Sequence, residues 1–159
     1  MIPAFGIRKQ DVQDVQDVKN QGTPQASRSR PFPPLTSPTI LLVEDQKGQR
    51  DLIRQTLREH NFVVLFAADG ETGLRLCQQH VGTIDLLIAD VVMPGMSGLH
   101  MAEQIRAQRP NIRVLFISGL IPEPTVRAKV SKLDRFLSKP FSQEQLVQTV
   151  QDVLAEPGR

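Results

Sequence analysis

The sequence places acidic side chains directly after two short apolar runs and an ammonium group after another. Glu44 and Asp45 follow one run, Asp90 follows a second, and Lys139 comes just after the last. Three carboxylates held close together repel one another, so such a cluster needs a cation. Oxygen ligands suit a hard divalent ion, and Mg²⁺ usually takes one or two carboxylates and keeps waters and phosphate oxygens as its other ligands. The residue types therefore indicate a magnesium site that could meet a phosphate group.

The same residues have the chemistry needed to accept a phosphoryl group. The carboxylate of Asp90 would be the nucleophile. Lys139 and the hydroxyl of Ser118, which ends a further apolar run, could contact the equatorial phosphoryl oxygens on the side away from the metal. This interpretation requires a fold that brings the ends of the apolar runs together.

The apolar runs have the composition of buried strands. They are aliphatic and β-branched on both faces, which is typical of strands covered on both sides. The runs span residues 40–43, 62–68, 84–89, 112–117 and 136–137. Because helical patterns alternate with them, we predict an α/β fold with a doubly wound, five-stranded parallel sheet and helices on both faces. Ligands bind such sheets at the carboxyl ends of the strands, where the acidic residues fall.

Amphipathic patterns between the runs predict the helices. The apolar stripes are Leu52, Ile53, Thr56 and Leu57; then Leu99, Ala102 and Ile105; then Leu146, Val150, Val153 and Leu154. Ser142 and Gln145 predict a capping box at the start of the last helix. Turn signals stand at Asp69-Gly70 and Pro94-Gly95, and Pro122 and Pro124 predict a stiff entry to a fourth helix.

Composition divides the chain into a leader and a domain. Residues 1–38 hold six of the twelve prolines and are otherwise rich in polar residues, which predicts a disordered extension. A Gln-Asp-Val triplet repeats over residues 10–18 and leaves a short docking helix as the alternative. We expect the folded domain at residues 39–155 and a tail at residues 156–159.

Charge and composition disfavour several classes of protein. Residues 39–159 carry equal numbers of acidic and basic side chains, so we expect no direct nucleic-acid binding. No apolar run has the length of a membrane span, and the start lacks a secretory signal, so we expect a cytoplasmic location. The single cysteine, Cys77, is interpreted as a core residue. His60, His80 and His100 lack metal-ligand spacing and are interpreted as surface or helix-end residues.

Four segments together resemble the receiver domain of two-component response regulators, here of the stand-alone type. They are ILLVED at residues 40–45, DVVMPGMSG at 90–98, VLFISG at 114–119 and FLSKPF at 136–141. The resemblance covers about residues 39–155 and implies a flavodoxin-like sheet of strand order 2-1-3-4-5.

The resemblance also implies a role for each matching residue. Asp90 is phosphorylated, and Lys139 pairs with the phosphoryl oxygens. Mg²⁺ is held by Glu44, Asp45, Asp90 and the backbone carbonyl of Val92. Ser118 is the switch hydroxyl, and Phe136 stands at the aromatic switch position. The Lys139-Pro140 peptide is commonly cis in the family.

Two features depart from the usual pattern. Phe136 has no hydroxyl, so its rotamers differ only in packing. Val92 and Leu120, two residues past Asp90 and Ser118, are apolar where polar residues often favour hydrolysis of the phosphorylated state.

As partners we expect a histidine kinase or histidine phosphotransfer protein as donor and an unknown output protein. Only one helix fits after Phe141, so we expect output by protein contact, through the surface of the fourth helix, fifth strand and fifth helix. We therefore predict a phosphorylation-activated switch with no enzymatic activity beyond its own phosphorylation and dephosphorylation. The main alternative is a phosphorelay intermediate or phosphate sink.

Two other functions fit the expected fold less well. A Mg²⁺-dependent phosphohydrolase wants an acid two residues past its nucleophile, where this chain has Val92. An FMN carrier wants a Ser/Thr/Gly-rich phosphate loop after the first strand, where this chain has Asp45-Gln46-Lys47-Gly48.

Overall fold

The computed structural model describes residues 36–119, 128, 130–132 and 134–157. The predictions for the leader fall almost wholly outside these residues. So do those for Leu120, for Pro122 and Pro124 and the fourth helix they introduce, and hence for the output surface as a whole.

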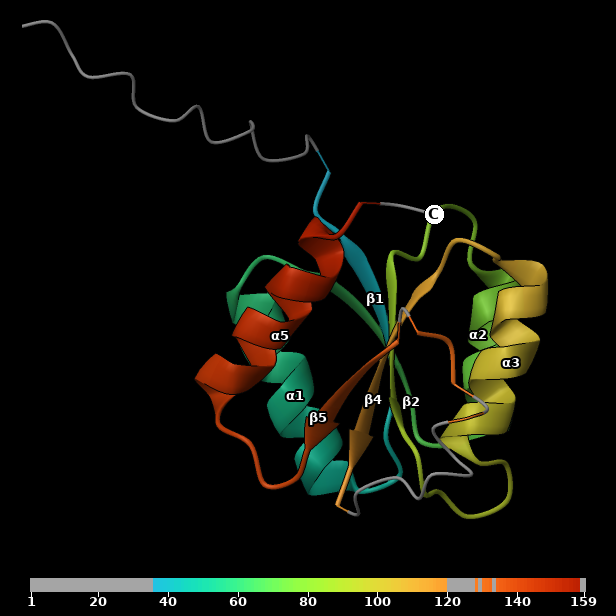
Figure 1. Cartoon of the computed structure of the whole chain (residues 1–159), viewed down its shortest axis with the longest axis horizontal. Helices are drawn as coiled ribbons and strands as arrows, with labels where there is room; N and C mark the ends of the chain where they lie inside the picture. Colours follow the sequence, from blue (N-terminus) through green and yellow to red (C-terminus); the bar gives the residue numbers. More distant parts are fainter. Residues whose placement is uncertain (1–35, 120–127, 129, 133, 158–159) are drawn as a thin grey trace, which may run out of the picture. The chain divides into compact units, whose positions relative to one another are not determined.

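Five strands form one parallel sheet in the order β2-β1-β3-β4-β5, which confirms the predicted fold (Figure 1). The strands are β1 (Thr39–Val43), β2 (Val63–Ala67), β3 (Leu86–Asp90), β4 (Arg113–Ser118) and β5 (Arg135–Ser138). The strand order reverses between β1 and β3, so the loops after these two strands diverge at the carboxyl edge and leave room for a site there.

Helices cover both faces of the sheet (Figure 1). Helices α1 (Lys47–Glu59) and α5 (Gln143–Ala155) lie on one face, and α2 (Gly70–Gln79) and α3 (Gly98–Gln108) lie on the other. None of the helices described is long and apolar enough to cross a membrane.

The central strands are buried on both sides because successive side chains face opposite helix layers. In β1, Ile40 and Leu42 belong to the core under α1 and α5, whereas Leu41 and Val43 belong to the core under α2 and α3. All four are fully buried. This two-sided burial explains why the strand is a continuous apolar run and shows no alternation of apolar and polar residues.

The expectation of two-sided burial is wrong for the edge strands. In β2, Val63 is 48% exposed and Phe66 is 40% exposed, and no residue of β5 is fully buried. These two strands each have a neighbour on one side only, so the helix layers cover them incompletely. The apolar composition of β2 resembles that of a central strand, and only the strand order reveals that it lies at an edge.

Among the described residues, the helix predictions hold with one correction. Ser142 and Gln145 form the predicted capping box, and Cys77 is buried in the core beneath α2. Asp69 is the N-cap of α2 and accepts a hydrogen bond from the Thr72 amide, so this turn signal marks a helix start. Leu52, which we placed in the buried stripe of α1, is 47% exposed because only Ile53, Thr56 and Leu57 of that group face the sheet.

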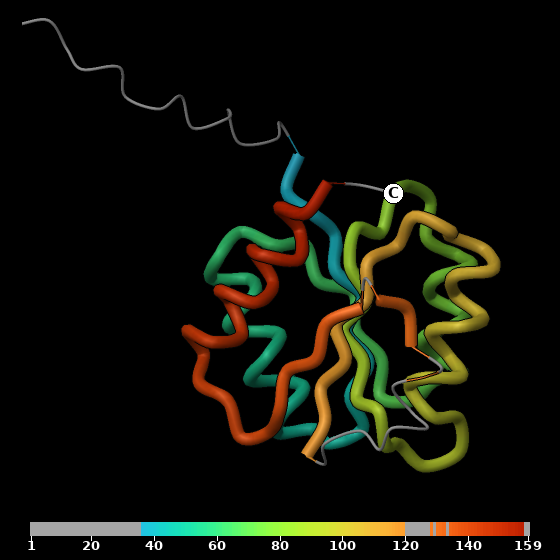
Figure 2. Tube along the Cα trace, in the orientation of Figure 1, coloured from blue at the N-terminus to red at the C-terminus, as the bar shows by residue number. Residues whose placement is uncertain are grey.

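The two edges of the sheet carry different parts of the chain (Figure 2). The start of β1 and the end of α5 lie at the amino edge. The loops that lead from β1 and β3 lie at the opposite, carboxyl edge.

Candidate metal centre at the carboxyl edge of the sheet

Three carboxylates meet at the carboxyl edge. Glu44 and Asp45 directly follow β1, and Asp90 is the last residue of the neighbouring strand β3. One carboxylate oxygen from each residue lies within 4.8 Å of the other two. Glu44 and Asp90 are buried, whereas Asp45 is half-buried. The strand ends therefore bring together the acidic residues that the sequence singled out.

Lys139 joins this cluster from the loop after β5. Its ammonium nitrogen lies 2.6 Å from Oδ2 of Asp90 and 3.1 Å from Oε2 of Glu44. Burial, the largest single influence, lowers the pKa of Lys139, but its hydrogen bonds and attraction to Asp90 and Glu44 together raise the pKa above its usual value. Lys139 is therefore a cation at neutral pH and offsets part of the negative charge of the cluster.

Glu44 is the most deeply buried acid of the three. Burial raises its pKa above the usual value, and the hydrogen bonds from the Gln46 amide and from Lys139 offset this only in part. The amide of Gln46 donates to Oε1 of Glu44 over 3.1 Å. A raised carboxyl pKa means that the surroundings hold the negative charge at a cost, which a nearby cation would reduce.

The Asp90 side chain is held by a neighbouring backbone amide as well as by Lys139. Its Oδ1 accepts a hydrogen bond from the Val92 amide at 2.9 Å. At Gly98, where α3 begins, an added Cβ would lie only 1.9 Å from the carbonyl oxygen of Asp90. Glycine is required there because α3 starts against the backbone of the site. The residue that supplies the amide to Asp90, Val92, is 65% exposed.

The two residues at the switch positions lie on adjacent strands. Ser118 is buried at the end of β4, and its carbonyl accepts a hydrogen bond from the Lys139 amide at 2.8 Å. Phe136, in β5, is half-buried and stacks on Phe116 with ring centroids 5.3 Å apart. The peptide bond between Lys139 and Pro140 is cis.

The donor set suits Mg²⁺. It is made only of oxygen atoms, which hard divalent cations prefer, and its carboxylates come from two neighbouring strand ends. Three carboxylates and one ammonium leave a formal charge of two negative units, which a divalent ion would neutralise. No histidine belongs to this cluster, and within the described residues His60 and His80 cap the ends of α1 and α2.

Sequence reasoning missed one residue at this edge. The guanidinium of Arg50, from α1, donates to the carbonyl oxygens of Glu44 at 2.8 Å and Asp45 at 3.2 Å. The sequence hinted at such a contact only by lacking a good capping residue at the start of α1. Gln46, at the N-cap of α1, is a poorer cap than Ser or Asp, and this left the loop without an evident anchor.

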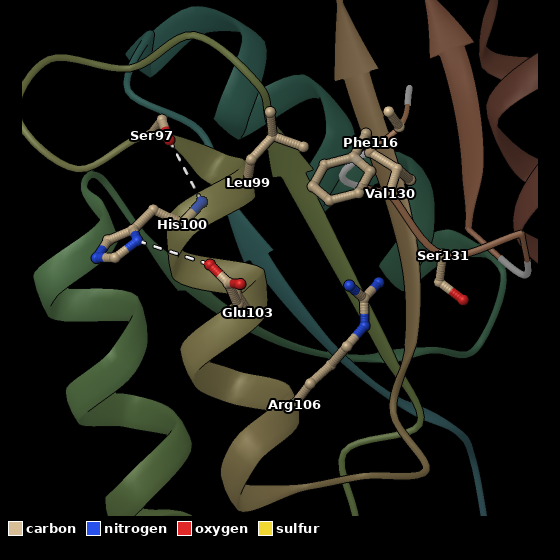
Figure 3. A pocket seen from close by; sticks show the side chains of 9 residues that line it. Ser97, Leu99, His100, Glu103, Arg106, Phe116, Val130 and Ser131 are labelled. Atoms are coloured by element: carbon tan, nitrogen blue, oxygen red, sulfur yellow. Dashed lines mark hydrogen bonds and ion pairs between the residues drawn. The ribbon is translucent and has the colours of Figure 1, made fainter. Parts of the chain in front are cut away.

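A separate hollow of about 700 Å³ lies beside α3 and β4 (Figure 3). Its described lining residues are Ser97, Leu99, His100, Glu103, Arg106, Phe116, Ala128, Val130 and Ser131. None of them is a carboxylate or lysine of the cluster. Arg106 pairs with the buried side chain of Asp134, which joins α3 to the residue before β5.

Comparisons with known proteins place this site in context. The sequence profile described as the response regulator receiver domain matches residues 40–151. The sensor kinase CckA of Brucella abortus is 34% identical over 119 residues, which cover 74% of this chain but only 13% of the kinase.

Solved structures share the fold of this chain. The chemotaxis protein CheY4 of Vibrio cholerae superposes with a TM-score of 0.67 at 28% identity, over 74% of this chain and 99% of that one. The receiver domain of a hybrid histidine kinase CckA superposes with a TM-score of 0.62 at 37% identity, over 73% of this chain and 98% of that domain.

Proposed function

Because this chain belongs to the response regulator receiver domain family, we propose that it is a phosphorylation-activated signalling switch with Asp90 as the phosphoacceptor. One observation carries the assignment of the residue. Asp90 is the carboxylate that both belongs to the acidic cluster and receives the closest contact from Lys139, at 2.6 Å. Its position at the end of a fully buried strand supports the same role.

This chain would supply the nucleophile and the groups that neutralise the phosphoryl oxygens from this edge. A carboxylate oxygen of Asp90 forms the new bond to phosphorus. The bond from phosphorus to the imidazole nitrogen of a donor histidine breaks, and its electron pair stays on that nitrogen. Lys139, already on Oδ2 of Asp90, would neutralise an equatorial phosphoryl oxygen, and the hydroxyl of Ser118 would donate to another.

Mg²⁺ is the proposed cofactor, and Glu44, Asp45, Asp90 and the backbone carbonyl of Val92 would hold it. Bound there, it would neutralise charge on the incoming phosphoryl oxygens. Glu44 and Asp45 would keep the ion next to Asp90, because all three offer an oxygen within one small region. Val92 lies two residues past Asp90 and supplies no acid for turnover of a phosphoester, which argues against a hydrolase.

The phosphodonor and the output partner would both be proteins. The donor would be a histidine kinase or histidine phosphotransfer protein, and the output would be contact with a second protein in the cytoplasm, without direct binding to nucleic acid. A role within a phosphorelay is the second candidate. It is favoured by the 37% identity to the receiver domain of a hybrid histidine kinase.

The test is phosphorylation with a small-molecule phosphodonor and Mg²⁺, followed by intact mass. We expect one addition of roughly 80 Da, the mass of one phosphoryl group. Asp90→Asn should abolish the addition, whereas Asp85→Asn, at the amino edge, should leave it intact. Labelling that persists in Asp90→Asn would contradict the assignment of the phosphoacceptor.

A further inference from the structure

The Arg50 side chain contacts the loop between β1 and α1 through two backbone carbonyls. Its Nη1 donates to the carbonyl oxygens of Glu44 and Asp45, at 2.8 and 3.2 Å. These are the two residues between β1 and α1 whose carboxylates face Asp90. Arg50 therefore holds the backbone of the acidic pair and leaves both carboxylates available to a cation.

The start of α1 differs from the starts of the other described helices. Helices α2, α3 and α5 each have an N-cap whose side chain accepts from a backbone amide, at Asp69, Ser97 and Ser142. Gln46, at the N-cap of α1, makes no such bond. The loop is held instead by the Arg50 guanidinium on its carbonyls and by the Glu44 carboxylate on the Gln46 amide.

We propose that Arg50 is a positioning residue for the Mg²⁺ site, acting through the backbone of Glu44 and Asp45. This inference rests on the proposed function, because it presupposes that Mg²⁺ binds at this edge. Metal ligands keep their orientation only when a second set of contacts fixes them, and removing such contacts typically weakens metal binding by about 10–100-fold. Two hydrogen bonds to adjacent carbonyls limit rotation of the segment that carries both carboxylates.

A purely electrostatic role for Arg50 predicts the opposite result. Arg50 adds a positive charge close to the site, which repels a divalent cation. If that were its only effect, removal of the guanidinium would strengthen Mg²⁺ binding. If Arg50 acts by position, removal weakens binding although the site becomes more negative. The direction of the change therefore separates the two roles.

The experiment is calorimetric titration of the whole chain with Mg²⁺ in the absence of any phosphodonor. Arg50→Met should raise the dissociation constant by about tenfold or more. The matched control is Arg54→Met, one turn further along α1. Arg54 lies over the Phe66 ring at 4.5 Å and pairs with Asp51, and neither contact involves the loop. Arg54→Met should bind Mg²⁺ like the wild type.

The possible results bear on different conclusions. If the wild type binds Mg²⁺ and Arg50→Met binds it equally or more tightly, the positioning role is wrong. If the wild type does not bind Mg²⁺ at all, the proposed cofactor and this inference both fail. If Arg50→Met does not fold, Arg50→Lys replaces it. It keeps the charge and shortens the side chain, so weaker Mg²⁺ binding would support positioning and unchanged binding would contradict it.

Discussion

At the carboxyl edge of the sheet, Glu44, Asp45 and Asp90 lie together, and Glu44 and Asp90 share Lys139 as their ammonium partner. At the amino edge, carboxylates also join elements, but each has its own donors. Asp85 accepts from the Thr39 amide at 2.8 Å, and Glu156 pairs with Arg135.

Asp134 extends the same contrast. It directly precedes β5, and its side chain is buried like those of Glu44 and Asp90. It differs in having a cation of its own, because Oδ1 pairs with Arg106 and Oδ2 accepts from the Ser131 amide at 2.9 Å, whereas Glu44 and Asp90 share Lys139. A buried carboxylate that has its own cationic partner stabilises the fold. Carboxylates that share too few cations can bind a metal ion.

The two edges therefore differ in which acids a metal ion can use. At the amino edge, Asp134 and Glu156 each pair with an arginine of their own, so these carboxylates need no further cation. At the carboxyl edge the formal charge of two negative units is left for a divalent ion to neutralise. The comparison therefore predicts that substitutions at the carboxyl edge change the response to Mg²⁺, and that substitutions at the amino edge change stability alone.

The largest effect is expected for Asp45→Ala. In wild-type protein, Mg²⁺ at 100 times its dissociation constant should raise the free energy of unfolding by about 2.7 kcal/mol. Asp45→Ala should lose that gain, and without metal it should be no less stable, because one repelling charge is removed. Urea unfolding with and without Mg²⁺ measures both quantities. A full Mg²⁺ gain in Asp45→Ala would place the metal elsewhere.

A smaller effect is expected for the lifetime of the phosphorylated state. Val92 presents an apolar and 65% exposed side chain at the carboxyl edge, and we expect Leu120, outside the described residues, to flank the same approach. Neither can orient an attacking water by a hydrogen bond. The double variant Val92→Asn, Leu120→Glu should therefore lose phosphate faster, by about tenfold, which corresponds to roughly 1.4 kcal/mol of barrier.

The measurement is the decay of phosphoprotein in Mg²⁺ buffer after the donor is removed, with Val92→Ile as the apolar control. The control should decay like the wild type. If the wild type decays as fast as the folded double variant, access of water is set by another feature, such as the absence of a side chain at Gly119, and the lifetime does not depend on Val92.

Sequence patterns predicted the sheet and the acidic cluster because both depend on local signals. A buried parallel strand is a continuous apolar run, and the residue that follows such a run lies at the carboxyl edge whatever the strand order. This was sufficient to bring Glu44, Asp90 and Lys139 into one hypothesis before any contact was known.

The features that were missed depend on tertiary neighbours. The exposure of Phe66 follows from the place of β2 at the edge of the sheet, which its composition does not reveal. Leu52 fits a helical stripe, but the sheet contacts a narrower part of α1 than the pattern suggested. Arg50 stands near the start of α1, where the helix dipole disfavours a basic residue. Its role becomes evident only from its contacts with the two carbonyls.

The smallest expected effect concerns the amino edge and tests the other half of the comparison. Asp85 ties the starts of three strands, because its side chain accepts from the Thr39 amide while its own amide and carbonyl bond to Thr39 and Arg113. Asp85→Ala removes only the side-chain bond, and because both residues are half-buried, water can partly replace it. We expect a loss of about 1 kcal/mol in the free energy of unfolding. The gain from Mg²⁺ should remain the same as in the wild type, since no acid of the metal cluster has changed. Urea unfolding at the two Mg²⁺ levels used for Asp45→Ala gives both numbers. If Asp85→Ala also reduced the Mg²⁺ gain, the two edges would be energetically coupled through the strands, and the division between a structural edge and a ligand-binding edge would not hold.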